Sequence, residues 1–379
     1  MNTYRLCFVL MAVLALSCTK TENSTPIDDE GPNADADYSV LIAHNGALSE
    51  TLLNANAEVI TKDPVSSPFQ SITLPEHSYR DGYNISWYTT NPDCTGELTK
   101  VDFSSYATKQ IAVFEDLLNC ELVVKSITHS DNSMFLAYAV PGTGVEDTSY
   151  FIRTVDASSE EITFTDIELE LEPVQIVFAL NKVFILSLDA DEEDKFALIV
   201  FDTNSGTLVH ELNLDYSAQR IFKTVDNNIM VSYPELHLVI HSSSMAVTET
   251  VRYNEGLEPK FGYSEVSVFG PAGNLYYPMP TNLDETDYPN IPGVYDFSTN
   301  TAVLYYFENF LTASERQFEF EIGDTTMVSY DTANNLILIG YQKSSDSNKG
   351  GLLRIKPIPE PAFIDNIDLD GVPKQIFIN

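Results

Sequence analysis

Residues 174–212 contain, in order, the segments VQIVFA (174–179), KVFILSL (182–188), ALIVFD (197–202) and TLVHEL (207–212). Each segment is short and rich in β-branched and aromatic residues, and the last two are joined by TNSG (203–206). Asn, Ser and Gly suit such connections because they tolerate positive φ or hydrogen-bond their own backbone. The stretch therefore predicts four antiparallel strands in a meander.

The same order of segments recurs along the chain at a nearly constant interval. Its marker is an Asn that ends a turn and precedes a strand: Asn84, Asn132, Asn181, Asn228, Asn274 and Asn335. The intervals between these residues are 48, 49, 47, 46 and 61. A further step of 47 back from Asn84 reaches Asp37, before YSVLIA (38–43), which makes seven units. Four strands repeated at about 40–50 residues are typical of a β-propeller blade.

We therefore expect an all-β protein in which residues 37–379 form a seven-bladed β-propeller with four-stranded antiparallel blades. The last segment, VPKQIFIN (372–379), has the pattern of a first strand with no second strand after it. It is predicted to pair with the strand that begins at Tyr38, which closes the ring and removes an open sheet edge. Residues 47–74 fit the first blade in two phasings. A stacked sandwich or a two-domain chain is the alternative architecture.

The first 36 residues have the pattern of an export and anchoring segment. Arg5 precedes an apolar run, Leu6–Leu16, whose eleven residues cover about half of a ~30 Å hydrocarbon core. Residues 1–17 are therefore predicted to be a signal peptide, with a buried N-terminal strand as the alternative. Ala15–Cys18 (ALSC) resembles a bacterial lipobox, which implies a lipidated Cys18. Residues 18–36 are acidic and poor in large apolar residues, so they predict a flexible tether.

The charge of the chain excludes one class of partner. Lys and Arg number 20 against 56 Asp and Glu, for a net charge of -36. Nucleic acid binding depends on neutralising phosphates with Lys and Arg, so no nucleic acid partner is expected. Anionic lipid headgroups are disfavoured for the same reason. Membrane attachment is therefore expected only through the lipid anchor.

The cysteines predict one disulfide. Cys7 lies in the signal peptide and Cys18 in the lipobox, which leaves Cys94 and Cys120. In an oxidising compartment such a pair is expected to be bonded. Two free buried thiols are the alternative.

Long loops predict the position of a binding site. In a propeller, the loops between second and third strands and the crossings between blades lie on one rim, here called the long-loop rim. Its long segments are residues 90–96, 141–148, 189–195, 281–293 and 342–351. Binding residues tend to lie on long loops held by a rigid scaffold. The candidate ligand residues on this rim are Asp93, Glu146, Asp147, Asp189, Asp191, Glu193, Asp194, Asp284, Asp287, Tyr288 and Asp346.

The acidic rim has two interpretations. A concentration of carboxylates attracts a cation, a cationic partner or Ca²⁺, whereas solvated loops of an acidic protein have the same composition. Residues 189–194 and 365–371 are acid-rich but lack EF-hand spacing, so they indicate Ca²⁺ only weakly. His237 and His241 lie four apart on a predicted strand, as two metal ligands or as outward polar residues. No cofactor is identified, and the metal content is unknown.

Catalysis is not indicated by any motif. The chain has no G-x-S-x-G, no HExxH, no P-loop and no dinucleotide fingerprint. No nucleophile with a base is nominated, although the many carboxylates leave a glycosidase pair open.

Two segments resemble known propeller families. ALIVFDTNSGTLVHELNL (197–214) is similar to YncE-like propeller repeats, and YSVLIAHNG (38–46) is similar to the start of cobalamin-binding surface propellers. The acids that follow Cys18, among them Asp28, Asp29 and Glu30, resemble those of Bacteroidota lipoproteins exported to the cell surface. The resemblance implies an accessory protein of a TonB-dependent outer-membrane transporter. It carries over neither cobalamin as ligand nor any binding residue.

The leading hypothesis is a lipoprotein anchored in the outer membrane at the cell surface, which binds a ligand or partner on its long-loop rim as an accessory of a transport system. A periplasm-facing anchor is the alternative location. The alternative functions are a protein-interaction or adhesion module without small-molecule cargo, and a carbohydrate-active propeller enzyme.

Overall fold

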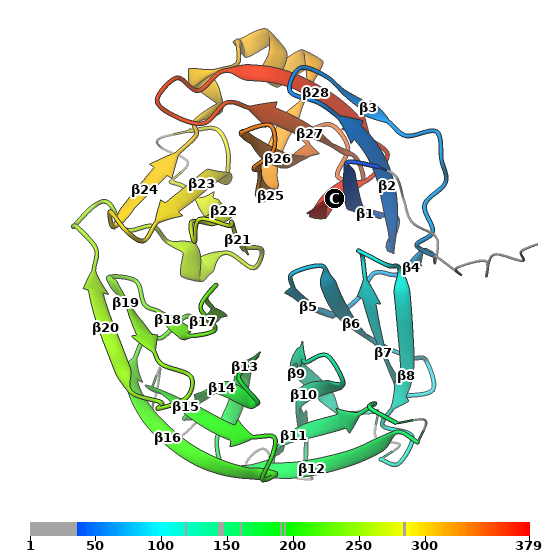
Figure 1. The fold of residues 1–379 in the computed structure, drawn as a ribbon, viewed down its shortest axis with the longest axis vertical. Helices are drawn as coiled ribbons and strands as arrows, with labels where there is room; N and C mark the ends of the chain where they lie inside the picture. Colours follow the sequence, from blue (N-terminus) through cyan, green and yellow to red (C-terminus); the bar gives the residue numbers. More distant parts are fainter. Residues whose placement is uncertain are drawn as a thin grey trace, which may run out of the picture.

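The computed structural model describes residues 36–117, 120–142, 148–159, 161–189, 192, 195–282 and 286–379. In this part, the strands form seven antiparallel sheets arranged as a ring around a central opening (Figure 1). The seven-bladed propeller predicted from the repeat is therefore confirmed. The predicted signal peptide, Cys18 and nearly all of the tether lie outside the described residues. Within those residues, no helix has the length and apolar character needed to cross a membrane.

Six blades follow one another along the chain with four strands each. The second blade holds β5 (His77–Asp81), β6 (Asn84–Thr90), β7 (Gly96–Asp102) and β8 (Ala107–Val113). The third holds β9 (Val123–His129), β10 (Ser133–Val140), β11 (Ser149–Asp156) and β12 (Thr163–Leu169), and the fourth holds β13 (Glu172–Ala179), β14 (Lys182–Leu188), β15 (Lys195–Asp202) and β16 (Thr207–Tyr216). The fifth holds β17 (Arg220–Lys223), β18 (Ile229–Ser232), β19 (Leu236–Ile240) and β20 (Val247–Arg252). The sixth holds β21 (Val268–Phe269), β22 (Leu275–Pro280), β23 (Asn290–Asp296) and β24 (Thr301–Leu304), and the seventh holds β25 (Ile322–Asp331), β26 (Leu336–Lys343), β27 (Gly350–Ile355) and β28 (Phe363–Leu369).

The remaining blade is built from both ends of the described chain. Its strand order is β29 (Val372–Ile378), β1 (Tyr38–His44), β2 (Ala47–Ala55) and β3 (Ile60–Lys62), and β4 (Ile72–Thr73) also pairs with β2. In the register of β1 and β29, Tyr38 lies opposite Ile378. The predicted ring closure is thus confirmed. The outer edge of this blade is split, because β3 and β4 pair with opposite ends of β2.

Turn residues explain why the repeat is visible in the sequence. Asn45, Asn181 and Asn335 have φ of 48°, 59° and 54°, in the left-handed region that Asn tolerates better than most residues. Third strands end in an Asp that holds the next turn. Asp202 Oδ1, for example, accepts hydrogen bonds from the backbone N–H groups of Asn204 and Ser205 at 3.0 and 2.9 Å. These bonds satisfy backbone donors that the turn would otherwise leave without a partner.

Buried side chains fill the wedges between neighbouring blades. Between the closing blade and the second blade, Trp87 and Phe103 are buried with Phe377, whose ring stacks on that of Phe103 at 4.2 Å between centroids. Gln175 joins two inner strands at another seam, since its amide both donates to and accepts from the backbone of Ile221 at 3.0 and 2.9 Å. The core is therefore a ring of clusters between neighbouring blades.

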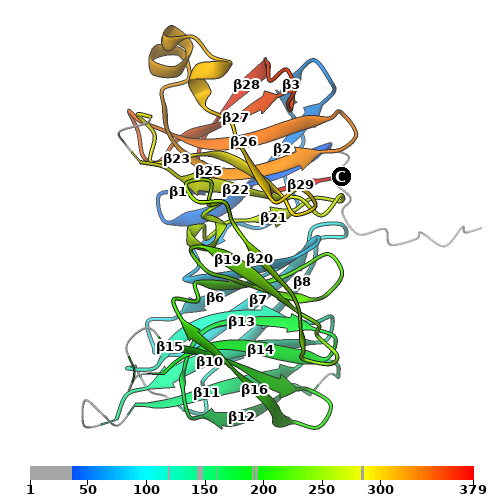
Figure 2. The same cartoon turned by 90° about the vertical axis from the view of Figure 1, so that its left-hand side faces the viewer.

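The two rims of the ring differ. The long-loop rim holds η1 (Phe261–Tyr263), η2 (Phe307–Asn309) and η3 (Glu315–Glu319) in its crossings, and the longest crossing projects beyond the sheets at the top of Figure 2. That crossing accounts for the repeat interval of 61. The other end of the ring, here called the short-turn rim, is formed by the turns from first to second and from third to fourth strands. The two ends of the described chain meet there, where the N–H of Asn379 donates to the carbonyl oxygen of Asp37 at 3.0 Å.

Candidate functional site

Three of the four described candidate acids of the long-loop rim interact within their own loops. Asp93 Oδ1 accepts from the hydroxyl and the N–H of Thr95 at 2.6 and 3.2 Å, and these bonds lower the pKa of Asp93. Asp189 lies 3.7 Å from Lys195 Nζ, and Asp346 accepts from the N–H of Asn348 at 3.0 Å. Asp287 is exposed. These acids belong to different blades, and the structure does not bring them together.

Tyr288 is a core residue rather than a rim residue in this structure. Its side chain is 5% exposed, and its ring meets that of Phe307 edge-on at 4.8 Å between centroids. Its backbone oxygen accepts a hydrogen bond from the hydroxyl of Thr281. The ring face is therefore used for packing.

The other predicted rim residues fall outside the described part of the chain. They are Glu146, Asp147, Asp191, Glu193, Asp194 and Asp284. The Cys94–Cys120 disulfide is confirmed and joins the β6–β7 loop to the β8–β9 crossing, so it lies on the long-loop rim.

In the described ranges, no group of three or more His, Cys, Asp or Glu side chains is arranged to hold a metal ion. In the acid-rich segment near the C-terminus, Asp365, Asp368 and Asp370 each pair with a different cation. His237 is buried and shares a hydrogen bond of 3.1 Å with the hydroxyl of Tyr253, and burial lowers its pKa to about 4. His241 follows β19 and is exposed, so the two histidines do not form a ligand pair.

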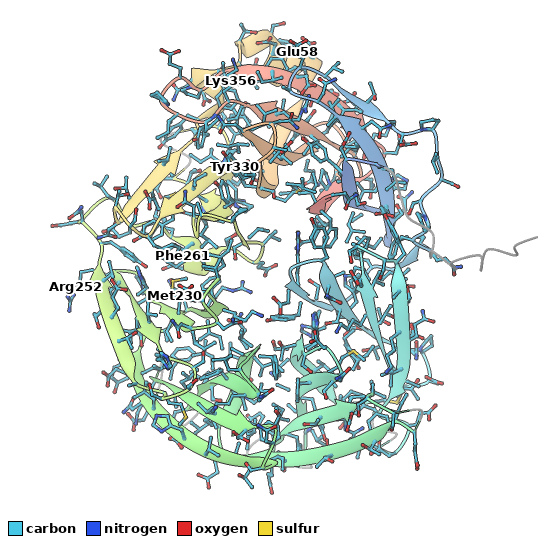
Figure 3. The ribbon with its side chains drawn as sticks, viewed as in Figure 1. Glu58, Met230, Arg252, Phe261, Tyr330 and Lys356 are labelled. Carbon is cyan, nitrogen blue, oxygen red and sulfur yellow. A yellow bond between two sulfur atoms is a disulfide. The ribbon has the colours of Figure 1, made fainter. Side chains whose placement is uncertain are left out.

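A cavity of about 720 Å³ lies on the ring axis and opens at the short-turn rim, opposite the predicted site. Its wall is made by the inner strands β5, β13, β17, β21, β25 and β29 and by the turns that follow several of them. Tyr276 and Tyr330 form one side, with their rings stacked at 5.4 Å and 7°. Tyr330 lies at the inner end of its blade, whereas Arg252 lies at the outer edge of the ring (Figure 3).

Cations are concentrated in this cavity. Its lining includes Arg80, Arg220 and Lys223 against the acids Asp81 and Glu265, although acids outnumber basic residues 56 to 20 in the whole chain. The locally positive balance is therefore a property of the site and opposes that of the protein.

Arg80 is fixed in place by neutral groups. Its Nη1 donates to Gln375 Oε1 at 3.0 Å and to the carbonyl oxygen of Ile376 at 2.8 Å, and its Nε donates to the carbonyl oxygen of Gly82 at 3.0 Å. The guanidinium also lies 4.1 Å from the centre of the Phe377 ring. Burial lowers the pKa of Arg80 to about 10, so the group stays charged at neutral pH.

Arg220 is the cation with free donors. It is half-buried, and no described residue accepts a hydrogen bond from its guanidinium or forms an ion pair with it. Burial lowers the pKa of Arg220, and the charge of the exposed Glu265 acts in the opposite direction. A partly desolvated guanidinium with five donors is poised to bind an acceptor from outside the chain.

Lys223 is occupied by Asp81, with which it forms an ion pair. Both residues also line a second cavity of about 560 Å³ on the same rim. The buried His129 borders that cavity, where its Nδ1 shares a hydrogen bond of 2.7 Å with Ser86 Oγ. The axial cavity is thus a preformed pocket with polar and aromatic walls, which suits binding of a small molecule.

No protein family model matches this chain, and no curated protein matches it. Among solved structures, the chain is similar to a candidate 6-phosphogluconolactonase from Bacteroides uniformis, with 10% identity and a TM-score of 0.52 over 89% of this chain and 98% of the other. It is also similar to a puromycin hydrolase variant at 8% identity and a TM-score of 0.52, over 90% of this chain and 53% of that one. Apo AztD from Citrobacter koseri matches at 10% identity and a TM-score of 0.47, over 91% and 87% of the two chains. At these identities the likeness shows the fold alone.

Proposed function

We propose that this protein is a lipoprotein anchored at the cell surface that binds a small molecule in its axial cavity, as an accessory of an outer-membrane transport system. The observation that carries the proposal is the cavity of about 720 Å³ on the axis, lined by polar and aromatic side chains from six blades. This volume lies within the range of about 300–1,000 Å³ of small-molecule sites. Because the wall consists of inner strands, the site is held by the rigid part of the fold.

The position of Ala36, where the described part of the chain begins, supports a role close to the membrane. The side-chain amide of Asn379 donates to the carbonyl oxygen of Ala36 at 2.8 Å, and the adjacent Ile378 lines the axial cavity. A tether from a lipidated Cys18 would therefore join the propeller on the rim where the cavity opens. A flexible tether attached at this rim would let the mouth of the cavity approach a transporter in the membrane.

A plugged cavity tests this function. Ala333 is exposed and lines the cavity mouth, so Ala333→Trp narrows the entrance without changing the core. Ala107→Trp, on the exposed start of β8, is the matched control. Thermal unfolding of the chain from Thr19 would be measured against haem, ferric siderophores, cobalamin, oligosaccharides and small organic acids. A ligand at 100 times its Kd adds about 2.7 kcal/mol to the free energy of unfolding.

We expect a ligand that raises the Tm of the wild type and of Ala107→Trp but not of Ala333→Trp. An equal rise in Tm in all three proteins would show that the ligand does not bind in the axial cavity. Protease treatment of intact cells tests the location, because a surface protein is cleaved and a periplasm-facing one is protected.

Exposed apolar side chains on the opposite rim favour a second candidate, a protein-interaction module. Leu257, Tyr263 and Phe318 lie in the long-loop crossings and are 69%, 56% and 79% exposed. Exposed apolar groups of this size mark protein contacts when they form a patch. Replacing all three by Ser would abolish pull-down of an outer-membrane partner and leave small-molecule binding unchanged.

A further inference from the structure

The charge pattern of the axial cavity identifies a class of ligand. Three cations and two acids line it in a chain with 20 basic and 56 acidic residues. Of the two acids, Asp81 is held by Lys223, while Glu265 is exposed at the edge. The charge in the pocket that no ion pair neutralises is therefore positive.

Arg220 is the cation in the pocket whose donors are free to bind a ligand. Arg80 donates to three neutral oxygens and rests on Phe377, so its geometry is fixed by the protein. Arg220 has no acceptor in the described part of the chain, although its stem is partly removed from water. A planar guanidinium without a partner matches the two oxygens of a carboxylate or phosphate, with which it forms paired hydrogen bonds.

The wall beside these cations limits the rest of the ligand. Four aromatic residues line one side of the cavity, Phe222, Phe269, Tyr276 and Tyr330. Phe222 and Tyr276 are 8% and 6% exposed and belong to the core, so the partly buried Phe269 and Tyr330 provide the aromatic surface that a ligand can reach. A free inorganic anion would leave that side unused, whereas a flat organic body would cover it. A polyanion is disfavoured by the net charge of -36.

We propose that the axial cavity binds a small organic anion whose carboxylate or phosphate group is held by Arg220, with Arg80 and Lys223 setting the local field and Phe269 and Tyr330 covering its apolar body. This inference rests on the proposed function, since it names the class of cargo for the same cavity.

Four probes separate the parts of the ligand in a calorimetric titration. Benzoate and phenyl phosphate supply a flat body with either head group, inorganic phosphate supplies the head alone, and benzamide supplies the body without charge. We expect one or both aromatic anions to bind at least about tenfold more tightly than benzamide and than inorganic phosphate, because the paired bonds are charge-assisted. The affinity of the anion should fall as sodium chloride is raised.

Arg220→Met should lower the affinity for the aromatic anion at least about tenfold and leave the affinity for benzamide unchanged, since only the anion binds the guanidinium. Arg252→Met, on the exposed outer edge of the ring, is the matched control and should bind like the wild type. Without ligand, Arg220→Met should raise the Tm by a few degrees, because an unpartnered, partly buried charge is removed. That measurement also shows that the variant folds.

Equal affinity for benzamide and benzoate, or anion binding that Arg220→Met leaves intact, would overturn the anion assignment. Failure of every anion to bind at millimolar concentration would overturn it as well. None of these results touches the proposed function, which fails instead if Ala333→Trp retains the cargo that the wild type binds.

Discussion

Lys223 on β17 and Asp81 on β5 form an ion pair between the fifth and second blades, which are not neighbours in the ring. Each residue lies on the innermost strand of its blade, so the pair bridges two blades across the ring axis. Both residues line the axial cavity and also the second cavity beside it. The ion pair is therefore part of the wall between the two cavities.

Breaking this pair should have a small effect on stability. The Lys223 and Asp81 side chains are 18% and 39% exposed, so water screens much of their attraction. We expect Lys223→Met and Asp81→Asn each to lower the free energy of unfolding by about 1 kcal/mol or less, as measured by urea denaturation. The double variant should lose little more than either single variant, because both remove the same interaction. Fully additive losses would show that the two residues act independently.

A buried ion pair at the ring closure should matter more. Arg354 is 0% exposed, donates twice to Asp365 at 2.7 Å, and reaches the carbonyl oxygen of Asn56 in the closing blade at 2.6 Å. Asp365→Ala leaves the buried guanidinium without its carboxylate, so we expect a loss of about 3 kcal/mol in chemical denaturation.

The control for that variant is Asp370→Ala. Asp370 also forms an ion pair, with Lys62, but its side chain is 87% exposed. We expect its loss to cost less than about 1 kcal/mol. Similar losses for the two variants would contradict a special role for the buried pair.

The fold could be predicted from the sequence because each blade repeats its turn chemistry. Asn181 and Asn335 mark the first turn at positive φ, and Asp202 and Asp296 end third strands by accepting N–H bonds from the next turn. These local requirements recur at the blade period. The split outer strand of the first blade could not be resolved, since β3 and β4 are only three and two residues long.

The candidate site could not be predicted from loop length. Arg80 and Arg220 are 140 residues apart and line one cavity only because the ring brings β5 and β17 to one axis. A signal was nevertheless present, because Arg80 and Arg220 precede the marker residues Asn84 and Asn228 by four and eight positions, near the first strand of each repeat unit. In the long loops, by contrast, the acids accept hydrogen bonds from neighbouring residues of the same loop, as Asp93 does from Thr95.

His129 should make folding sensitive to mild acid. Burial, with the charges of Lys100 and Lys223, lowers its pKa to about 3, whereas an unfolded histidine titrates near about 6.5. Between about pH 3 and pH 6.5, the unfolded chain therefore binds a proton at this histidine and the folded chain does not. The stabilising contribution is fully present above about pH 6.5 and is lost progressively as the pH falls toward about 3.

In the wild type, His129 should lower the free energy of unfolding by about 1.4 kcal/mol for each pH unit of acidification within that window. We expect the His129→Gln variant to lack this contribution. Urea denaturation at pH 6 and pH 5 measures the difference on both proteins. His237, whose pKa is lowered to about 4, keeps part of the pH dependence in the variant. Identical pH slopes for the two proteins would contradict a neutral, buried His129.

The Cys94–Cys120 disulfide should stabilise the ring without affecting the axial cavity. It closes a segment of 26 residues between the second and third blades on the long-loop rim, whereas the cavity opens on the short-turn rim. Loop-closure entropy for such a segment is worth about 3 kcal/mol, so Cys94→Ser with Cys120→Ser should lower the free energy of unfolding by that order. Wild-type protein treated with a reductant should show the same loss, which controls for the substitutions themselves. Anion titration of the double variant should match that of the wild type, since neither cysteine lines the cavity. A variant that lost ligand affinity while remaining folded would show instead that the two rims are coupled through the blades.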